Sequence, residues 1–202
     1  MTLLPDADEV FRTFFAPWYA PEDLARRGFL ATRSDAQGWA RPGVAVADAS
    51  PLTPEAQKEA EWRVSQMVMA ATDDWPNVVR VSGSPSMEWI DAFDRHYDRK
   101  RVAAVIAASN PADFDNELVI LSCEFGAMLG KVLSDEAAEL EWLYDWPYWE
   151  SALYDPKHGM RINVFHWAIK KFSDYGVDDG FRAKVLQCRD LVRKGWSEST
   201  VA

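Results

Sequence analysis

The chain has little of what secreted or membrane proteins need. Its 202 residues include only two cysteines, Cys123 and Cys188, and both lie in apolar patterns of helical spacing. This setting favours buried, reduced thiols over a disulfide. Acidic residues occupy positions 6, 8 and 9, where a secretory signal peptide would carry basic ones. No apolar run approaches the roughly 20 residues of a membrane-spanning helix. We therefore expect a cytoplasmic protein with no membrane partner.

Basic residues are also scarce. The 22 lysines and arginines are outnumbered by 32 aspartates and glutamates, which gives a formal net charge of -10. Because nucleic-acid binding needs a basic surface that neutralises phosphate, this balance argues against a nucleic-acid partner. It is compatible with a partner protein that presents a basic surface.

Motifs for cofactors and metals are missing as well. The sequence has no phosphate-binding loop, dinucleotide-binding glycine motif, nucleophile elbow or Cys/His metal spacing, so we predict no cofactor and no metal. The nearest approach is a group formed by Asp91, Asp94, His96 and Asp98. On a helix the three aspartates share a face and the histidine points elsewhere, so we interpret the group as a solvated charge ladder.

Hydrophobic residues, by contrast, make up 48% of the chain and aromatic residues 13%, enough for a core. Helical spacing, with typical start and stop residues, predicts most of the secondary structure. We predict helices over residues 6–16, 21–28, 53–72, 86–109, 116–133, 166–175 and 179–194. Residues 98–101 are either a turn or part of a longer helix. We predict mostly loop over 30–53, and one short strand over 78–81 after a break at Trp75-Pro76.

An alternating pattern in the last third of the chain predicts a β-hairpin. Trp142, Tyr144 and Trp146 alternate with other residues at the period of a strand. Pro147 cannot donate to a ladder, so this strand is bent there or lies at an edge. Residues 156–159 form a turn, and the hairpin spans about residues 140–165. The whole pattern predicts one α+β domain over residues 1–202, mainly helical, with five to seven helices.

The helix over residues 116–133 contains two glycines, Gly126 and Gly130. Each costs a helix about 1 kcal/mol relative to alanine. We therefore expect both to lie against another backbone element and the helix to be the packing centre of the fold.

Glu124 is the strongest candidate for a functional ionisable group. It lies in the same apolar helix, and a buried carboxylate needs a partner or a raised pKa, which is common at functional sites. The alternative is a glutamate on an exposed strip or paired with an arginine. A small hydrolase would use Glu124 with His158 or His166. A pair formed by a cysteine and a histidine stays open, because such partners meet only in space.

The aromatic residues around Pro147 have two interpretations. Trp146, Tyr148 and Trp149 are candidate binding residues for a sugar or a peptide, since aromatic side chains are common interface anchors. Alternating aromatic residues on a half-buried strand are more often part of a core.

Several short motifs lie in this central region, namely Phe125-Gly126-x-x-Leu129-Gly130, Trp142, Asn163-x-Phe165 and Lys170-Lys171. Their order resembles a group of small bacterial domains of unknown function, some of them in proteins that resemble toxin-immunity proteins. The resemblance covers about residues 113–180. It implies a bacterial source and the α+β unit, and it assigns no catalytic residue.

Together these observations predict a non-catalytic, cytoplasmic protein-binding domain of an immunity-like or regulatory kind. The alternatives are the small hydrolase and a ligand-binding module built on the aromatic hairpin. A homodimer is left open.

Overall fold

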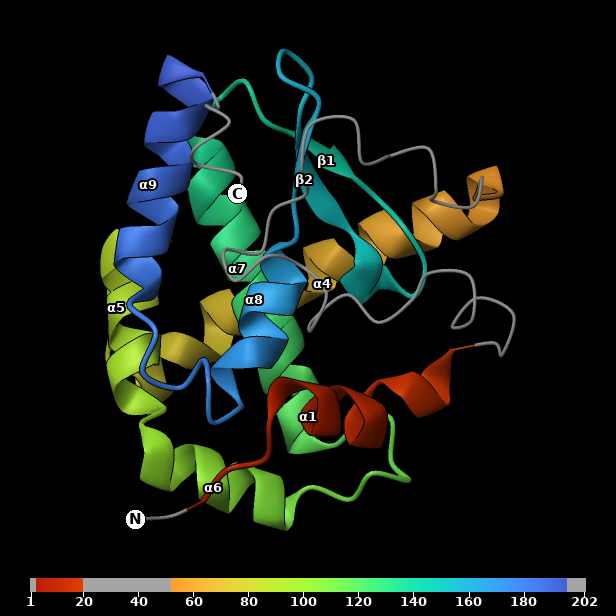
Figure 1. Cartoon of the computed structure of the whole chain (residues 1–202), viewed down its shortest axis with the longest axis vertical. Helices are drawn as coiled ribbons and strands as arrows, with labels where there is room; N and C mark the ends of the chain where they lie inside the picture. Colours follow the sequence, from red (N-terminus) through yellow and green to blue (C-terminus); the bar gives the residue numbers. More distant parts are fainter. Residues whose placement is uncertain (1–2, 20–51, 196–202) are drawn as a thin grey trace.

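The computed structural model describes residues 3–19 and 52–195. It confirms the α+β class: the chain is mainly helical, and a small antiparallel sheet lies near its C-terminus (Figure 1). The first part of the described chain contains α1 (Ala7–Phe14), the 3-10 helix η1 (Ala16–Trp18), α4 (Pro54–Val78), α5 (Met87–His96), α6 (Arg99–Ala108) and α7 (Glu117–Glu136). The second part contains β1 (Glu141–Leu143), the 3-10 helix η3 (Tyr148–Glu150), β2 (Ala152–Asp155), β3 (Met160–Ile162), α8 (Val164–Lys171) and α9 (Phe181–Lys194).

Side-chain caps fix the starts of four helices. The side chains of Asp6, Thr53, Asp98 and Asn116 each accept a hydrogen bond from a backbone N–H in the first turn of the helix that follows. The cap at Asp98 settles the segment 98–101, because it begins a new helix after the end of α5.

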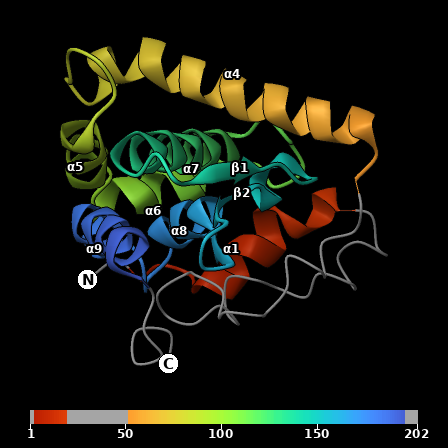
Figure 2. The same cartoon turned by 90° about the horizontal axis from the view of Figure 1, so that it is seen from above.

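Helix α7 is the packing centre, as predicted. It lies between α4 and α8 (Figure 2), and every residue from Ser122 to Gly130 is buried. A Cβ atom on Gly126 would lie 2.9 Å from the Phe165 Cα of α8, so this glycine permits two backbones to approach. Gly130 also faces a close neighbour, but that neighbour is the Trp142 ring of β1 and not a backbone.

The sheet has the strand order β1-β2-β3 with antiparallel pairing throughout, so β1 and β3 are its edges. The single bent strand expected before the turn at 156–159 is in fact two strands, β1 and β2, paired with each other. Pro147 has no N–H to donate, and the chain leaves the ladder before it. The Ser151 hydroxyl then accepts a hydrogen bond of 3.0 Å from the Asp145 N–H, which closes the connection.

Two local predictions after residue 72 are wrong. Helix α4 does not end before Trp75-Pro76 but continues to Val78, and residues 78–81 form no strand. Pro76 lies in the last turn, where its missing N–H leaves little of the helix unpaired. The Trp75 ring stacks on Phe93 with centroids 4.5 Å apart, and this packing holds the turn in place.

The ends of the last two helices also differ from the prediction. Helix α8 covers Val164–Lys171, and α9 begins after Gly180 without a side-chain cap. The two aspartates that precede α9 could have capped it but have other partners, since Asp178 accepts from Arg99 and Asp179 accepts from Lys184. Gly195 ends α9 with a φ of 94°, as predicted. The predicted helix over 21–28 lies outside the described residues, as does almost all of the predicted loop over 30–53. Within the described ranges, no helix is long and apolar enough to cross a membrane.

Candidate functional site

Glu124 is buried in α7, with a relative exposure of 4%. Its Oε2 atom accepts a hydrogen bond of 3.1 Å from Trp75 Nε1 of α4. Burial, with a smaller contribution from Asp74, raises the pKa of Glu124 to about 7, although the Trp75 hydrogen bond acts in the opposite direction. The Glu124 carboxyl group therefore changes between its protonated and ionised forms near neutral pH. Among the described residues it makes no ion pair.

The two histidines considered as its catalytic partners lie in other surroundings. His158 is in the turn between β2 and β3, where its Nδ1 is 2.7 Å from Asp155 Oδ2. His166 is in α8, and its Nε2 is 3.8 Å from Glu150 Oε2. Within the described part of the chain, no hydrogen bond or ion pair joins Glu124 to either histidine. The structure thus brings each histidine to a different carboxylate from the one predicted.

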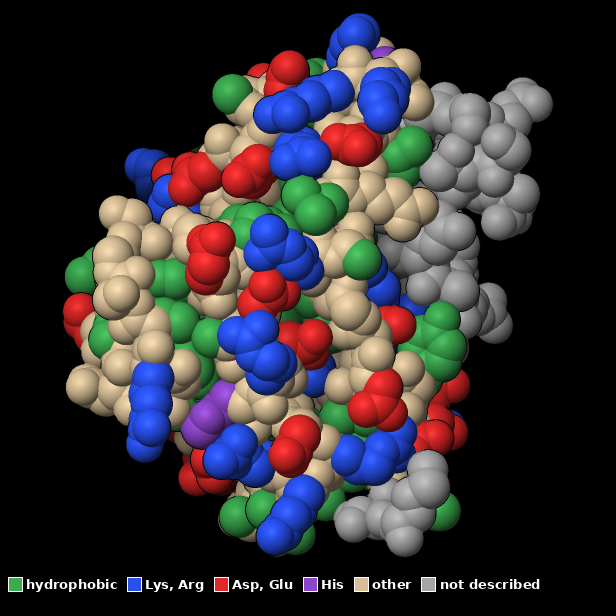
Figure 3. Space-filling model, turned by 90° about the vertical axis from the view of Figure 1, so that its left-hand side faces the viewer, with side chains coloured by type: hydrophobic (Ala, Val, Ile, Leu, Met, Phe, Trp, Pro, Cys, Tyr) green, Lys and Arg blue, Asp and Glu red, His purple; other side chains and the backbone are tan. Residues whose placement is uncertain are grey.

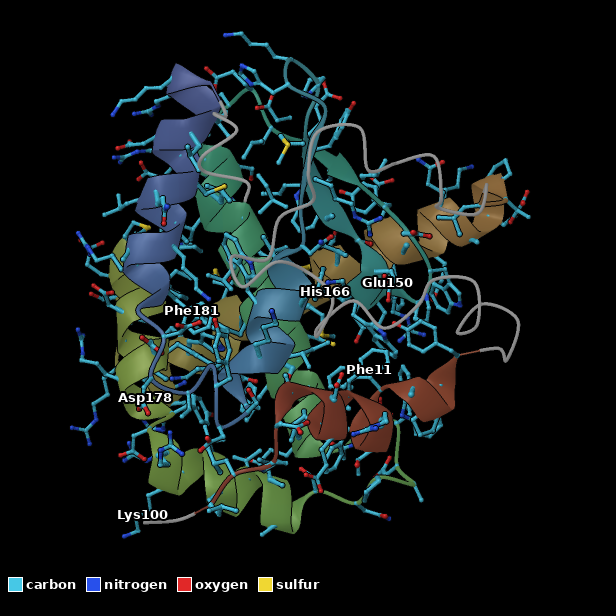
Figure 4. The ribbon with its side chains drawn as sticks, viewed as in Figure 1. Phe11, Lys100, Glu150, His166, Asp178 and Phe181 are labelled. Atoms are coloured by element: carbon cyan, nitrogen blue, oxygen red, sulfur yellow. The ribbon has the colours of Figure 1, made fainter. Side chains whose placement is uncertain are left out.

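A second carboxylate, Glu150, is the centre of a buried polar cluster. Figure 4 shows Glu150 and His166 side by side where the sheet meets α8. The Tyr19 hydroxyl donates to Glu150 Oε1, and Trp149 Nε1 donates to that hydroxyl over 2.9 Å. Arg161 Nη2 donates to the Glu150 carbonyl oxygen over 2.5 Å and lies 4.0 Å from its Oε2. Three side chains, those of Tyr19, Arg161 and His166, thus converge on one carboxylate, and Trp149 is joined to it through Tyr19.

The electrostatics of this cluster favour the ionised form of Glu150. Burial raises the pKa of Glu150, but the nearby His166 ring, the Arg161 guanidinium and the Tyr19 hydrogen bond outweigh it. The pKa of Glu150 is therefore below its ordinary value. Since Glu150 and His166 are each 2% exposed, a substrate has no surface of either residue to contact. The cluster joins the N-terminal segment to the sheet and to α8.

Sequence reasoning named His166 and Trp149, in other roles, and missed Tyr19, Glu150 and Arg161. Tyr19 and Glu150 are 131 positions apart, and no local pattern links residues at that separation. One signal was available, because Arg161 is a charged residue inside the short apolar strand β3 and is nearly buried there. A buried arginine requires a carboxylate partner, and Glu150 is close in sequence.

The predicted aromatic binding surface is wrong for two of its three residues. Tyr148 and Trp149 are 4% and 1% exposed, and their rings pack edge to face with centroids 5.1 Å apart. Trp149 also packs against Phe15 of the N-terminal segment. Both residues therefore belong to the core, which was the alternative interpretation. Only Trp146 is accessible, at 36%.

The cysteines and the aspartate group do not supply a reactive centre either. Cys123 and Cys188 are free and buried, and burial raises the pKa of the Cys123 thiol to about 12. The interpretation of the aspartates on α5 as a solvated charge ladder is only partly correct, because one of them is paired with a buried lysine. Asp94 lies 2.5 Å from Lys171 Nζ, a buried ammonium group that also donates to the Asp94 and Val177 carbonyl oxygens. In the part of the chain that the structure describes, no three His, Cys, Asp or Glu side chains could hold a metal ion.

On the outer surface, charge is distributed unevenly. The face formed by α5 and α9 carries cationic and anionic side chains next to each other (Figure 3), including an Arg182–Asp91 pair at 2.9 Å. Helix α4 differs, because its sequence has five carboxylates and only two cations. It also exposes two large apolar side chains, Trp62 at 49% and Met69 at 57%.

Comparison with protein-family models, with curated proteins and with solved structures finds no match for this chain, so no relative assigns a role to these residues.

Proposed function

We propose that the protein is a non-catalytic bacterial protein of the cytoplasm, immunity-like or regulatory, that binds a partner protein with a basic surface. The observation that supports this proposal is the uneven use of charge. Cationic side chains of the described residues are mostly engaged within the chain, whereas many exposed carboxylates are not.

The engaged cations lie on several helices. Arg99 pairs with Asp174 and Asp178, Lys171 with Asp94, Arg182 with Asp91, Lys184 with Asp179, and Arg189 with Glu136 and Asp190. Because each pair occupies a cation as well as a carboxylate, the pairing does not remove the acidic excess of the chain.

Exposed carboxylates without an ion pair to a described residue lie on α4, on the loop before α7 and around β1. Those near β1 are Glu139 and Glu141, and Glu61 of α4 is close enough to Tyr144 to add to the rise of its pKa, which is mainly due to burial. Glu61 of α4, Glu139 before β1 and Glu141 of β1 are together called the β1 acidic surface. Opposite charges on a partner would increase the association rate and favour correct orientation.

The burial of the reactive groups also supports binding over catalysis. Glu124, His166 and Cys123 are each at most 4% exposed. A general base or a nucleophile must come within hydrogen-bond distance of its substrate, and these side chains are enclosed by the core.

Affinity capture from the native host, followed by reconstitution with the purified partner, tests the proposal. We expect a complex that weakens as salt is raised, because interactions between exposed charges are screened. The variant Glu61→Gln/Glu139→Gln/Glu141→Gln should weaken it about 10-fold or more.

A matched control replaces three carboxylates that already have cationic partners, Asp91, Asp174 and Asp178, each by Asn. Its affinity should stay within about twofold. A purified complex that is insensitive to salt and to both triple variants would overturn the basic-partner proposal. Turnover of a substrate by the purified chain would overturn its non-catalytic character.

A further inference from the structure

The outer face of α4 has no described element packed on it. The inner face of this helix buries Ala60, Val64, Ala71 and Trp75 against the core. On the opposite face Trp62 and Met69 are the most exposed apolar side chains of the helix. Figure 2 shows α4 along one edge of the molecule, with α7 on its inner side and no ribbon over its outer side. Exposed single apolar residues are ordinary, but two on one helical ridge are a candidate interface.

Neighbouring side chains hold both apolar residues in position. The Arg63 guanidinium lies 4.9 Å from the centroid of the Trp62 ring, and Arg63 Nε is 2.9 Å from Glu59 Oε1. One turn further on, Gln66 Nε2 is 3.7 Å from Met69 Sδ. Side chains that are ordered before association lose less conformational entropy when they bind. Tryptophan and methionine are also enriched at protein interfaces.

Charges complete a symmetric pattern along the same ridge. Lys58 lies four residues before Trp62, and Asp73 lies four residues after Met69. At 100° per residue all four side chains fall on the outer face. The pairs 58 with 73 and 62 with 69 share one midpoint, between Ser65 and Gln66. A second copy of α4, reversed about that midpoint, therefore places a cation opposite an anion at both ends.

We infer that two copies of this chain form a dimer through the outer face of α4. The two helices are antiparallel, and the two-fold axis passes between Ser65 and Gln66. Trp62 of each copy packs on the other copy's Met69, and Lys58 of each copy pairs with the other copy's Asp73. The contact is isologous, as in most small homodimers.

The same charges argue against other arrangements of two copies. A parallel pair would place Lys58 opposite Lys58 and Asp73 opposite Asp73, and like charges in contact are destabilising. In the antiparallel register the acidic Glu55 lies opposite Pro76, and Glu59 lies opposite Thr72. The β1 acidic surface lies outside this ridge, because Glu61 points to the side of α4. The dimer is thus independent of the proposed function and leaves that surface free.

One helix pair buries a small area, so we expect a reversible monomer–dimer equilibrium of modest affinity. Sedimentation velocity over a range of protein concentrations should show it. Zero-length carbodiimide cross-linking of a mixture of isotopically light and heavy protein then tests the register. Lys58 and Asp73 of one copy are fifteen residues apart, about 22 Å along the helix, so a direct 58–73 link can form only between copies. We expect this link in mixed-isotope form.

Charge exchange tests the pairing itself. Lys58→Asp or Asp73→Lys alone should raise the dimer dissociation constant about 10-fold or more, and the double variant should restore it, because both contacts are re-formed with reversed sign. Trp62→Ser should leave only monomer. As a matched control, the exchange Lys131→Asp/Asp135→Lys alters an exposed pair on α7 and should have no effect. Circular dichroism confirms that each variant is folded.

Three results would overturn the inference. One is a monomer at all concentrations, and the second is a double exchange that fails to restore association. The third is a set of cross-links that joins Lys58 only to carboxylates at its own end of α4 and never to Asp73. If Trp62→Ser weakens only a complex with a basic partner protein, the ridge binds that partner and not a second copy. The proposed function is tested separately, because its variants lie on the β1 acidic surface.

Discussion

Helices α4 and α7 pack on each other, yet their sequences follow different rules. Helix α7 is enclosed on almost every side, whereas α4 buries one face and presents the other to solvent. In α7 the neighbouring elements limit the size of the side chain at each position, which is why residues 126 and 130 are glycines. In α4 only the inner face has that constraint, and the outer face is free to carry charge and exposed apolar side chains.

The comparison teaches how to interpret polar residues in each setting. Glu124 of α7 has one neutral donor, Trp75, and a raised pKa because it is buried. Glu59 of α4 has an arginine one turn away and remains in contact with water. The same residue type is therefore a pH-sensitive part of the core in one helix and a surface ion in the other.

The largest effect on stability is expected from a substitution that disturbs the close packing around α7. Gly126→Leu places a side chain against the Phe165 backbone, and an overpacked core site costs about 3 kcal/mol. For a chain of this length the melting temperature should fall by about 10 °C. Gly126→Ala should also fail to stabilise, although alanine is the better helix former. Ala104→Leu, at an exposed site of α6, is the control and should melt with the parent. Equal melting of both leucine variants would contradict close packing at Gly126.

The next effect sharpens the contrast between buried and exposed carboxylates. The pKa of Glu124 is about 7 in the folded state against an ordinary 4.5, so the folded state holds its proton over a range where the unfolded state has lost it. Stability is therefore lost as the pH rises through this range, by about 3 kcal/mol in total. Glu124→Gln should remove that loss, which denaturant unfolding at a series of pH values would measure. The control variant Glu61→Gln, on α4, keeps Glu124 and should lose stability over the same pH range as the parent.

A smaller effect is expected at the second glycine of α7. Gly130→Ala meets the ring of Trp142, a half-buried side chain on an edge strand that can move aside. We expect a loss of about 1 kcal/mol, less than at the backbone contact of Gly126. In a double-mutant cycle Trp142→Leu should recover most of the loss, since it removes the obstructing ring. Additive losses in the cycle would show that another neighbour is responsible.

The smallest effect concerns the outer face of α4. Trp62→Ser should change the stability of the monomer by no more than about 0.5 kcal/mol, because the side chain is half exposed. Trp75→Ser, on the inner face of the same helix, should cost about 3 kcal/mol or more. Both values come from unfolding at low protein concentration, where association does not contribute. Similar losses at the two positions would show that the outer ridge is packed in the monomer.

The fold was predictable at positions where a residue type is compatible with few kinds of local structure. Capping residues such as Thr53 and Asn116 mark helix starts, and the glycines of α7 indicate close packing. The failures are where tertiary contacts override a local rule. Pro76 does not end α4, because Trp75 anchors that turn in the core. The candidate site was less predictable still, since the partners of His166 come from Glu150 and, through it, from Tyr19 at the other end of the chain.

Because Tyr19 bonds to Glu150, the N-terminal segment can reach its final packing only late in the synthesis of the chain. The two residues are 131 positions apart, and the Asp174 N–H donates to the Pro5 carbonyl oxygen over a still longer separation. The N-terminal segment leaves the ribosome first, but its partners in η3 and after α8 leave among the last. Until then the apolar face of α1, with Phe11 and Phe14, has no core to enter. We therefore expect the apolar face of α1 to be buried only late in synthesis, after η3 and α8 have left the ribosome.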